Sequence, residues 1–168
     1  SYRRGETEHA AGRLADRIAA AFPQAQLFID VDSIRPGLDF VAAIERAVSQ
    51  SDVFLALIGP QWSSVVDHEG RRRLDDPEDF VVLELRAALD RDIRVIPILV
   101  DGAEMPKVTE LPPALKQFTR RNGVRLDGET FRQDSSALLE ELAKTLPAPS
   151  RISRRTLLRV AGGGAALA

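Results

Sequence analysis

The chain has 168 residues, of which 44% are hydrophobic, and a formal net charge of −2 at pH 7. This length and composition suffice for one core, so we expect a single domain with a short appendage. The weakly acidic balance provides no basic surface, and we predict no nucleic-acid partner. Because the chain has no cysteine and its histidines, His9 and His68, lie far apart, it lacks thiolate and helical zinc motifs, and we predict no metal site.

Apolar runs and helical repeats alternate over most of the chain. Apolar spacing predicts a helix over residues 8–22, followed by the short apolar run QLFID as a strand. A second helix near Phe40 precedes the run DVFLALIG, and the helix FVVLELRAALD precedes the run IRVIPILV. A short helix over residues 113–121, a weak strand GVRL and an amphipathic helix over residues 135–146 complete the series.

Strands without polar alternation, separated by helices, indicate a parallel sheet covered on both faces. We therefore predict a flavodoxin-like, doubly wound α/β fold of three α/β/α layers, with a five-stranded parallel sheet in the order 2-1-3-4-5. The opening SYRR is typical of a segment that follows an apolar strand, so we expect a fragment whose first strand is truncated at the amino terminus. Ligands of such sheets bind beyond the carboxyl ends of the strands.

Strong helix-start signals precede FVVLELRAALD. Asp76 can cap this helix, Pro77 suits its first turn, and Glu78 and Asp79 favour its dipole. We therefore expect the helix to begin just after Asp76. The connection before it is long, which favours a functional or mobile element, although its mixed charges also fit a solvated loop.

Glu84 is the most unusual polar residue of the chain. On a helical wheel counted from Phe80 it falls at about 40°, inside the apolar arc of its helix. Apolar surroundings disfavour a charged carboxylate, which makes Glu84 a candidate functional residue. Alternatively, Arg3, Arg4 or another cation pairs with it, or its carboxylate extends to water. Sequence position alone does not separate these interpretations.

Asp30 and Asp32 follow the first apolar run and could suggest a phosphoacceptor or Mg²⁺ site. A response-regulator receiver, which shares the predicted sheet order, needs its acceptor Asp after the third strand and a Lys near the fifth. This chain has LIGP and VRLD at those places. We therefore expect the two carboxylates mainly to satisfy backbone donors of their loop.

Five motifs, SYRR, FIDVDSIRPGLDF, DVFLALIGPQW, FVVLE and RVIPILVDG, together resemble a bacterial TIR domain over about residues 1–146. The chain is similar in particular to TIR domains that cleave NAD⁺. In those domains a Glu on the third helix is catalytic, and an aromatic residue four positions earlier lines the nicotinamide-ribose pocket. The resemblance implies that Glu84 is catalytic and that Phe80 takes the aromatic position, which is usually Trp in the enzymatic members.

The same resemblance implies further site residues. Tyr2, Arg3 and Asp32 would contact the substrate, and the loop after the second strand would mediate contacts between domains and gate the cleft. This interaction loop comprises Asp32, Ser33, Ile34, Arg35, Pro36 and Gly37.

The function that the resemblance implies is an NAD⁺ nucleosidase in bacterial immune or stress signalling. It would release nicotinamide and leave ADP-ribose or a cyclic or variant product, with NAD⁺ as substrate and no cofactor. The alternative is a non-catalytic TIR scaffold that signals by self-association with other TIR domains. Phe80 in place of Trp favours the scaffold, whereas Glu84 on an apolar face favours the enzyme.

Residues 147–168 differ in composition from the domain over residues 1–146. Four arginines in RISRRTLLR precede a stretch of small uncharged residues. This segment is either a flexible linker or, after residue 154, the start of a transmembrane helix. In the second case the arginines place the domain on the cytoplasmic side, and we expect a cytoplasmic domain in both. We also expect residues 150–168 to be mobile or loosely attached.

Overall fold

The computed structural model describes residues 1–3, 5–28, 39–146 and 157–159. The α-helices are α1 Glu8–Ala21, α2 Phe40–Ser49, α3 Phe80–Asp90 and α4 Phe131–Thr145. The 3₁₀ helices are η2 Arg73–Asp75, η3 Val108–Glu110 and η4 Pro113–Arg120. The strands are β1 Gln26–Phe28, β2 Val53–Ile58, β3 Arg94–Val100, β4 Val124–Leu126 and β5 Leu157–Arg159.

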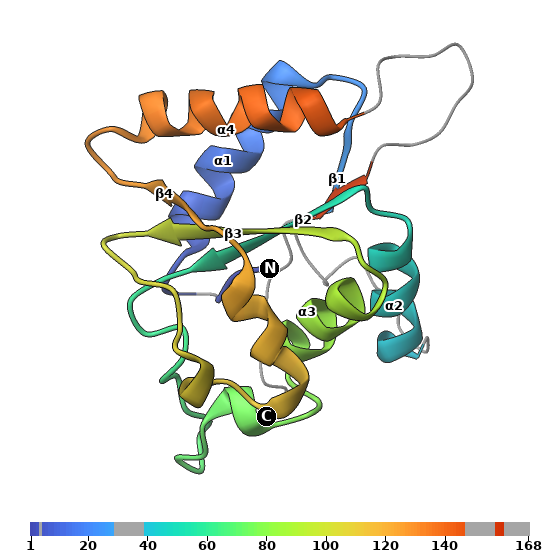
Figure 1. Cartoon of the computed structure of the whole chain (residues 1–168), viewed down its shortest axis with the longest axis vertical. Helices are drawn as coiled ribbons and strands as arrows, with labels where there is room; N and C mark the ends of the chain where they lie inside the picture. Colours follow the sequence, from blue (N-terminus) through green and yellow to red (C-terminus); the bar gives the residue numbers. More distant parts are fainter. Residues whose placement is uncertain (4, 29–38, 147–156, 160–168) are drawn as a thin grey trace.

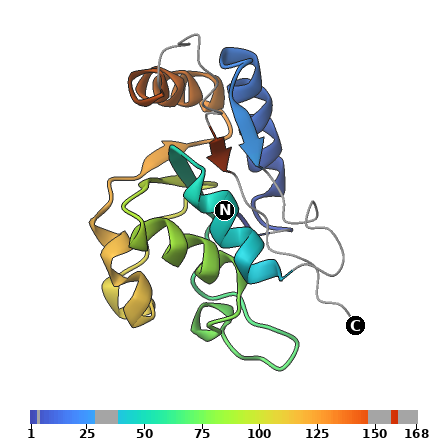
Figure 2. The same ribbon diagram turned by 90° about the vertical axis from the view of Figure 1, so that its right-hand side faces the viewer.

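The described strands form one parallel sheet in the order β1-β5-β2-β3-β4. Helices α1 and α4 cover one face of this sheet, and α2, α3 and η4 cover the other (Figures 1 and 2). The predicted three-layer, flavodoxin-like fold is confirmed. Strands β1, β2, β3 and β4 take the places predicted for the second to fifth strands.

The place predicted for the truncated first strand holds two segments. Strand β5 pairs with β1 and with the first residues of β2. Further along the same side of β2, the amino group of Ser1 donates to Leu55 O at 2.5 Å, and Leu57 N donates to Ser1 O at 2.6 Å. The amino-terminal segment therefore enters the domain along the middle of the sheet.

Within the segment expected to be mobile or loosely attached, Leu157–Arg159 form β5. Without this strand, β1 and β2 would face each other with unpaired backbone donors and acceptors, which an extended segment satisfies. The rest of the predicted linker and membrane-helix start lies outside the described residues. Within the described parts of the chain, no helix combines the length and apolarity that a membrane span requires.

The core has two halves, one on each face of the sheet. Alternate residues of β2 point into them: Val53, Leu55 and Leu57 toward α1 and α4, and Phe54, Ala56 and Ile58 toward α2 and α3. All six are buried, which explains why this strand is apolar without interruption.

Helix α3 begins three residues later than the sequence predicts, at Phe80. Its N-cap is Asp79, whose Oδ1 accepts from Val81 N at 3.1 Å and Val82 N at 3.3 Å. Asp76 instead belongs to the preceding turn, where its Oδ1 accepts from Glu78 N at 2.9 Å. The cap prediction at Asp76 is therefore wrong.

An ion pair joins the start of β3 to the end of α4. Arg94 Nη2 donates to Glu141 Oε1 at 2.6 Å, and Lys144 Nζ donates to Glu141 Oε2 at 3.2 Å. The hydrogen bond from Arg94, followed by that from Lys144, lowers the pKa of Glu141 below its ordinary value of 4.5. A carboxyl with a lowered folded-state pKa stabilises the fold above its unfolded-state pKa, and this contribution is lost as pH falls through the folded-state value.

We therefore expect Glu141 to titrate below pH 4.5 in the folded chain, as measured by the pH dependence of its side-chain NMR shifts. In Arg94→Gln, which removes the principal cause, the midpoint should move up toward the ordinary value. An identical midpoint in the parent and in Arg94→Gln would contradict this assignment.

Candidate functional site

The candidate site lies where the amino-terminal segment meets the first turn of α3. Arg3 Nη1 donates to Asp79 Oδ2 at 2.9 Å, and the side chains are 3% and 1% exposed. Two charges buried this deeply are tolerated because they pair, and removing Asp79 would leave Arg3 as a buried cation without this partner. The ion pair therefore fixes Arg3 at the start of α3.

The two carboxylate oxygens of Asp79 have separate tasks. Oδ1 caps α3, whereas Oδ2 accepts from Arg3 and also from Arg73 Nε at 2.8 Å. Arg73 belongs to η2 in the long connection between β2 and α3, and its side chain is 31% exposed. One carboxylate thus joins the amino-terminal segment, the connection and the helix that carries Glu84.

Glu84 is 0% exposed and is flanked by the buried residues Leu83 and Leu85. This burial excludes the alternative that its carboxylate extends to water. Of the two arginines considered as its partners, Arg3 is engaged by Asp79, and Arg4 lies outside the described residues. The carboxylate of Glu84 is therefore enclosed within the domain.

Phe80 lies one helical turn before Glu84 and is half-buried. Its ring centroid is 5.3 Å from that of Phe40, the first residue of α2, and the rings are tilted by 54°. Phe40 is 38% exposed, so the pair forms an aromatic surface that is partly open to solvent. Such tilted pairs stabilise the contact between two elements beyond the area that they bury.

Phe40 is not among the site residues predicted from the sequence. Asp39 caps α2 as Asp79 caps α3, with Oδ1 accepting from Val41 N at 3.0 Å and Ala42 N at 3.2 Å. Both helices begin with the same Asp-Phe-Val sequence, at residues 39–41 and 79–81. This repeat is the signal that could have pointed to a paired aromatic residue.

The other predicted site residues are not gathered around Glu84 in the described structure. Tyr2 is 4% exposed and packs in the core half formed with α1 and α4, on the face of the sheet opposite α3. This placement favours a packing role for its ring. Asp32 and the whole interaction loop, Asp32 to Gly37, lie outside the described residues, so their roles stay predictions.

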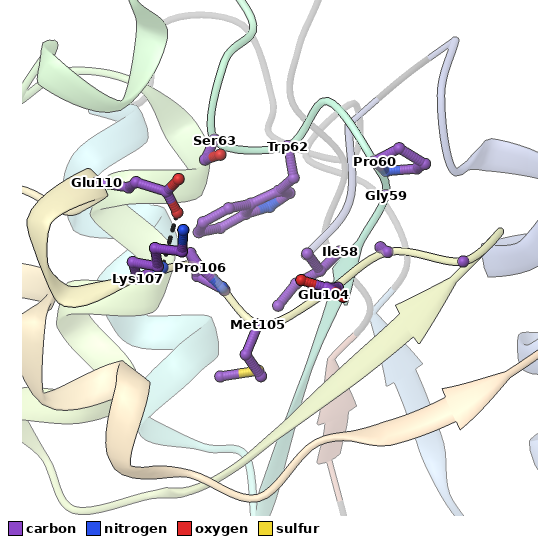
Figure 3. Close-up of a pocket in the computed structure, with 12 residues that line it drawn as sticks. Ile58, Gly59, Pro60, Trp62, Ser63, Glu104, Met105, Pro106, Lys107 and Glu110 are labelled. Atoms are coloured by element: carbon purple, nitrogen blue, oxygen red, sulfur yellow. Dashed lines mark hydrogen bonds between the residues drawn. The ribbon is translucent and has the colours of Figure 1, made fainter.

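A separate cavity of about 310 Å³ opens at the carboxyl ends of β2 and β3 (Figure 3). It is lined by Trp62 and by residues of the loop after β3, including Met105, Lys107 and Glu110. A hydrogen bond of 2.7 Å from Lys107 N to Glu110 Oε2 shapes that loop. No predicted site residue lines this cavity, so it is distinct from the surroundings of Glu84.

The order of the sheet, its two helical layers and the buried carboxylate on α3 define a doubly wound α/β domain with a polar site beside its central strands. The family model described as TIR domain matches residues 1–143. This match covers most of the chain, which therefore belongs to the TIR domain family. No curated protein matches the chain.

Proposed function

We propose that the chain is an NAD⁺ nucleosidase that cleaves the bond between nicotinamide and ribose, with Glu84 as its catalytic carboxylate. The observation that carries the proposal is the complete burial of Glu84, at 0% exposure, on a helix whose neighbouring residues are apolar. Burying a carboxylate costs free energy, and residues in such environments are concentrated at functional sites. Family membership supports the substrate, because TIR domains include members that cleave NAD⁺.

One carboxylate suffices for this reaction. The nicotinamide ring of NAD⁺ is cationic, so it leaves as a neutral molecule with the electron pair of the N-glycosidic bond and needs no general acid. Positive charge then develops on the ribose as an oxocarbenium-like transition state, which a preorganised carboxylate stabilises. Attack by water, with loss of a proton, gives ADP-ribose, whereas attack by an adenine nitrogen gives a cyclic product.

The aromatic pair supplies a stacking surface in this proposal. Phe80 lies four residues before Glu84, and Phe40 packs against it at 5.3 Å between ring centroids. Phe stacks on a planar ring as Trp does but lacks the indole N–H, so Phe80 contributes contact area without a hydrogen bond.

The covered position of Glu84 indicates that the site opens before it binds substrate. We place the domain in the cytoplasm, where self-association with other TIR domains through the interaction loop would drive this opening. Anchoring to a membrane through the segment after residue 154 would raise the local concentration of copies.

A non-catalytic scaffold is the second candidate function. Two observations favour it: the carboxylate of Glu84 is enclosed at 0% exposure, and Phe80 stands where enzymatic members usually have Trp. The scaffold shares the self-association of the enzyme but predicts no NAD⁺ turnover under any condition of assembly.

The proposed function is tested by measuring nicotinamide released from NAD⁺ at increasing concentrations of the purified chain. We expect a rate per molecule that rises with protein concentration, because assembly opens the site. Zero release over the whole range, including concentrations at which the chain is self-associated, would favour the scaffold.

Gly37→Glu is expected to abolish both self-association and NAD⁺ cleavage without changing the circular dichroism spectrum. Gly37 lies outside the described residues, and the expectation rests on the interaction loop, in which a glycine provides backbone freedom or the absence of a side chain. The measurement is light scattering together with nicotinamide release.

Gly12→Glu is the matched control for this loop variant. Gly12 is exposed on α1, and a side chain there meets nothing within 4 Å. It carries the same change of charge and should behave as the parent. Unchanged turnover and assembly in Gly37→Glu would show that the loop is not required.

A further inference from the structure

The carboxylate of Asp79 accepts more hydrogen bonds than helix capping requires. Its side chain is 1% exposed and accepts hydrogen bonds from two backbone amides and two guanidinium groups. A carboxylate needs neither arginine to cap a helix, as Asp39 shows at the exposed start of α2. The two ion pairs with arginine therefore indicate that Asp79 has a role beyond capping α3.

The first part of this role is to hold the guanidinium group of Arg3. Its guanidinium gives Nη1 to Asp79, while Nε and Nη2 are buried and have no hydrogen-bond partner among the described residues. Buried donors of this kind require an explanation, because each costs free energy when left unpaired. The ion pair leaves these two nitrogens as donors for an acceptor such as a ribose hydroxyl or a phosphate oxygen.

The second part of this role is to fix the first turn of α3. Asp79 immediately precedes Phe80, and its Oδ1 fixes the first turn through Val81 N and Val82 N. Rotation or translation of this turn would displace the ring of Phe80 and, one turn later, the carboxylate of Glu84. Arg73 Nε donates to the other oxygen, Oδ2, which also accepts from Arg3, so Asp79 is held both by the amino-terminal segment and by the connection before α3.

We propose that Asp79 is a positioning residue of the NAD⁺ site. It holds Arg3 against the first turn of α3, so that Glu84 and Phe80 are placed to contact the substrate. This inference rests on the proposed function. Asp79 itself touches no reacting atom and acts through Arg3, Phe80 and Glu84.

The main test is Asp79→Asn, compared with Asp39→Asn. Asn accepts the two capping hydrogen bonds as well as Asp does, so each variant keeps its helix cap. Among the described residues, only Asp79→Asn removes ion pairs, namely those with Arg3 and Arg73. We expect Asp79→Asn to raise KM about tenfold and to lower kcat by up to about 10²-fold, since small misplacements of catalytic groups cost this much. Asp39→Asn should match the parent.

The KM measurement separates positioning from a merely structural role. A variant that is partly unfolded contains fewer active molecules, which lowers the apparent kcat but leaves KM unchanged. A rise in KM therefore supports positioning of Arg3, and a fall in kcat at unchanged KM overturns it. Kinetic constants equal to those of the parent also overturn it.

If Asp79→Asn does not fold, Arg73→Gln tests the positioning role of Asp79. Arg73 is 31% exposed, so this change removes one of the two ion pairs from Oδ2 and keeps Arg3 paired. Its matched control is Arg71→Gln, because Arg71 lies on the same connection, is 69% exposed and pairs with Asp67 instead. A raised KM in Arg73→Gln alone supports the proposal, and equal values in both variants overturn it.

A readout without turnover distinguishes failure of this inference from failure of the proposed function. In NMR spectra, the nuclear Overhauser contact between the rings of Phe40 and Phe80 reports the position of the first turn of α3. We expect Asp79→Asn or Arg73→Gln to weaken it and the two controls to retain it. If the parent cleaves no NAD⁺, the proposed function fails, while an unchanged ring contact in the variants overturns the positioning role.

Discussion

Glu84→Gln is expected to lower NAD⁺ turnover by about 10²- to 10³-fold while the chain stays folded, because one preorganised electrostatic contact in a transition state has this magnitude. Gln keeps the size and the hydrogen-bonding capacity of the side chain but removes the negative charge that, in the proposed reaction, stabilises the oxocarbenium-like ribose. The variant should stay folded, as measured by its melting temperature and circular dichroism spectrum, because Gln fills the same buried space as Glu.

The comparison of rate with stability decides between a catalytic and a structural Glu84. A structural role predicts that activity falls only as far as the folded fraction does, whereas a catalytic role predicts a large loss in a fully folded variant. Glu140→Gln, which removes an exposed carboxylate from α4 on the other face of the sheet, is the matched control and should retain the rate of the parent. A folded Glu84→Gln variant that releases nicotinamide as fast as the parent would refute the assignment.

Phe80→Ala is expected to weaken the binding of NAD⁺. Removal of an aromatic side chain that stacks on a base typically costs about 1 to 3 kcal/mol, so KM for NAD⁺ should rise by about 5- to 150-fold. Glu84, the proposed catalytic carboxylate, is unchanged in this variant, so kcat should fall much less than in Glu84→Gln. Steady-state kinetics with NAD⁺, together with the melting temperature, measure both effects.

Two further variants control for the loss of packing in Phe80→Ala. Phe80→Trp restores the ring that enzymatic TIR domains usually carry and should preserve or improve turnover. Phe40→Ala removes the partner ring of the aromatic pair at α2 and should raise KM in the same direction. If Phe80→Ala binds NAD⁺ as tightly as the parent, the aromatic pair has no part in substrate binding.

The sequence predicts most of the fold because its strongest signals are local. The run VFLALI is apolar without alternation since both faces of β2 are buried, and this pattern alone indicates a parallel strand between two helical layers. The order of β1, β2, β3 and β4 then follows from the handedness of the crossovers between them.

Features that depend on contacts between residues far apart in the sequence could not be predicted from local patterns. The segment Asp75 to Asp79 offers several capping residues in succession, and local signals do not rank them. Asp79 is selected because Arg3, 76 residues away in the sequence, pairs with it in the buried start of α3. In the same way, the contact of Phe40 with Phe80 joins two helices separated by β2.

Strand β5 also could not be predicted from local patterns. Residues 157–159 lie in a segment without periodicity, next to arginines and glycines, and their own composition predicts no strand. Their pairing is decided by the facing backbones of β1 and β2, which lie far away in the sequence. The position of Glu84 on an apolar helix face, in contrast, was visible locally, and its burial follows from the packing of α3.

The catalytic role of Glu84 is tested by nicotinamide release from NAD⁺ by the parent and by Glu84→Gln, both held at the same high local density on a solid support. We expect the parent to release nicotinamide faster than it does in dilute solution, and the folded Glu84→Gln variant to be slower by at least about 10²-fold. Equal rates for the two proteins, or no release by the assembled parent, would show that Glu84 does not catalyse NAD⁺ cleavage.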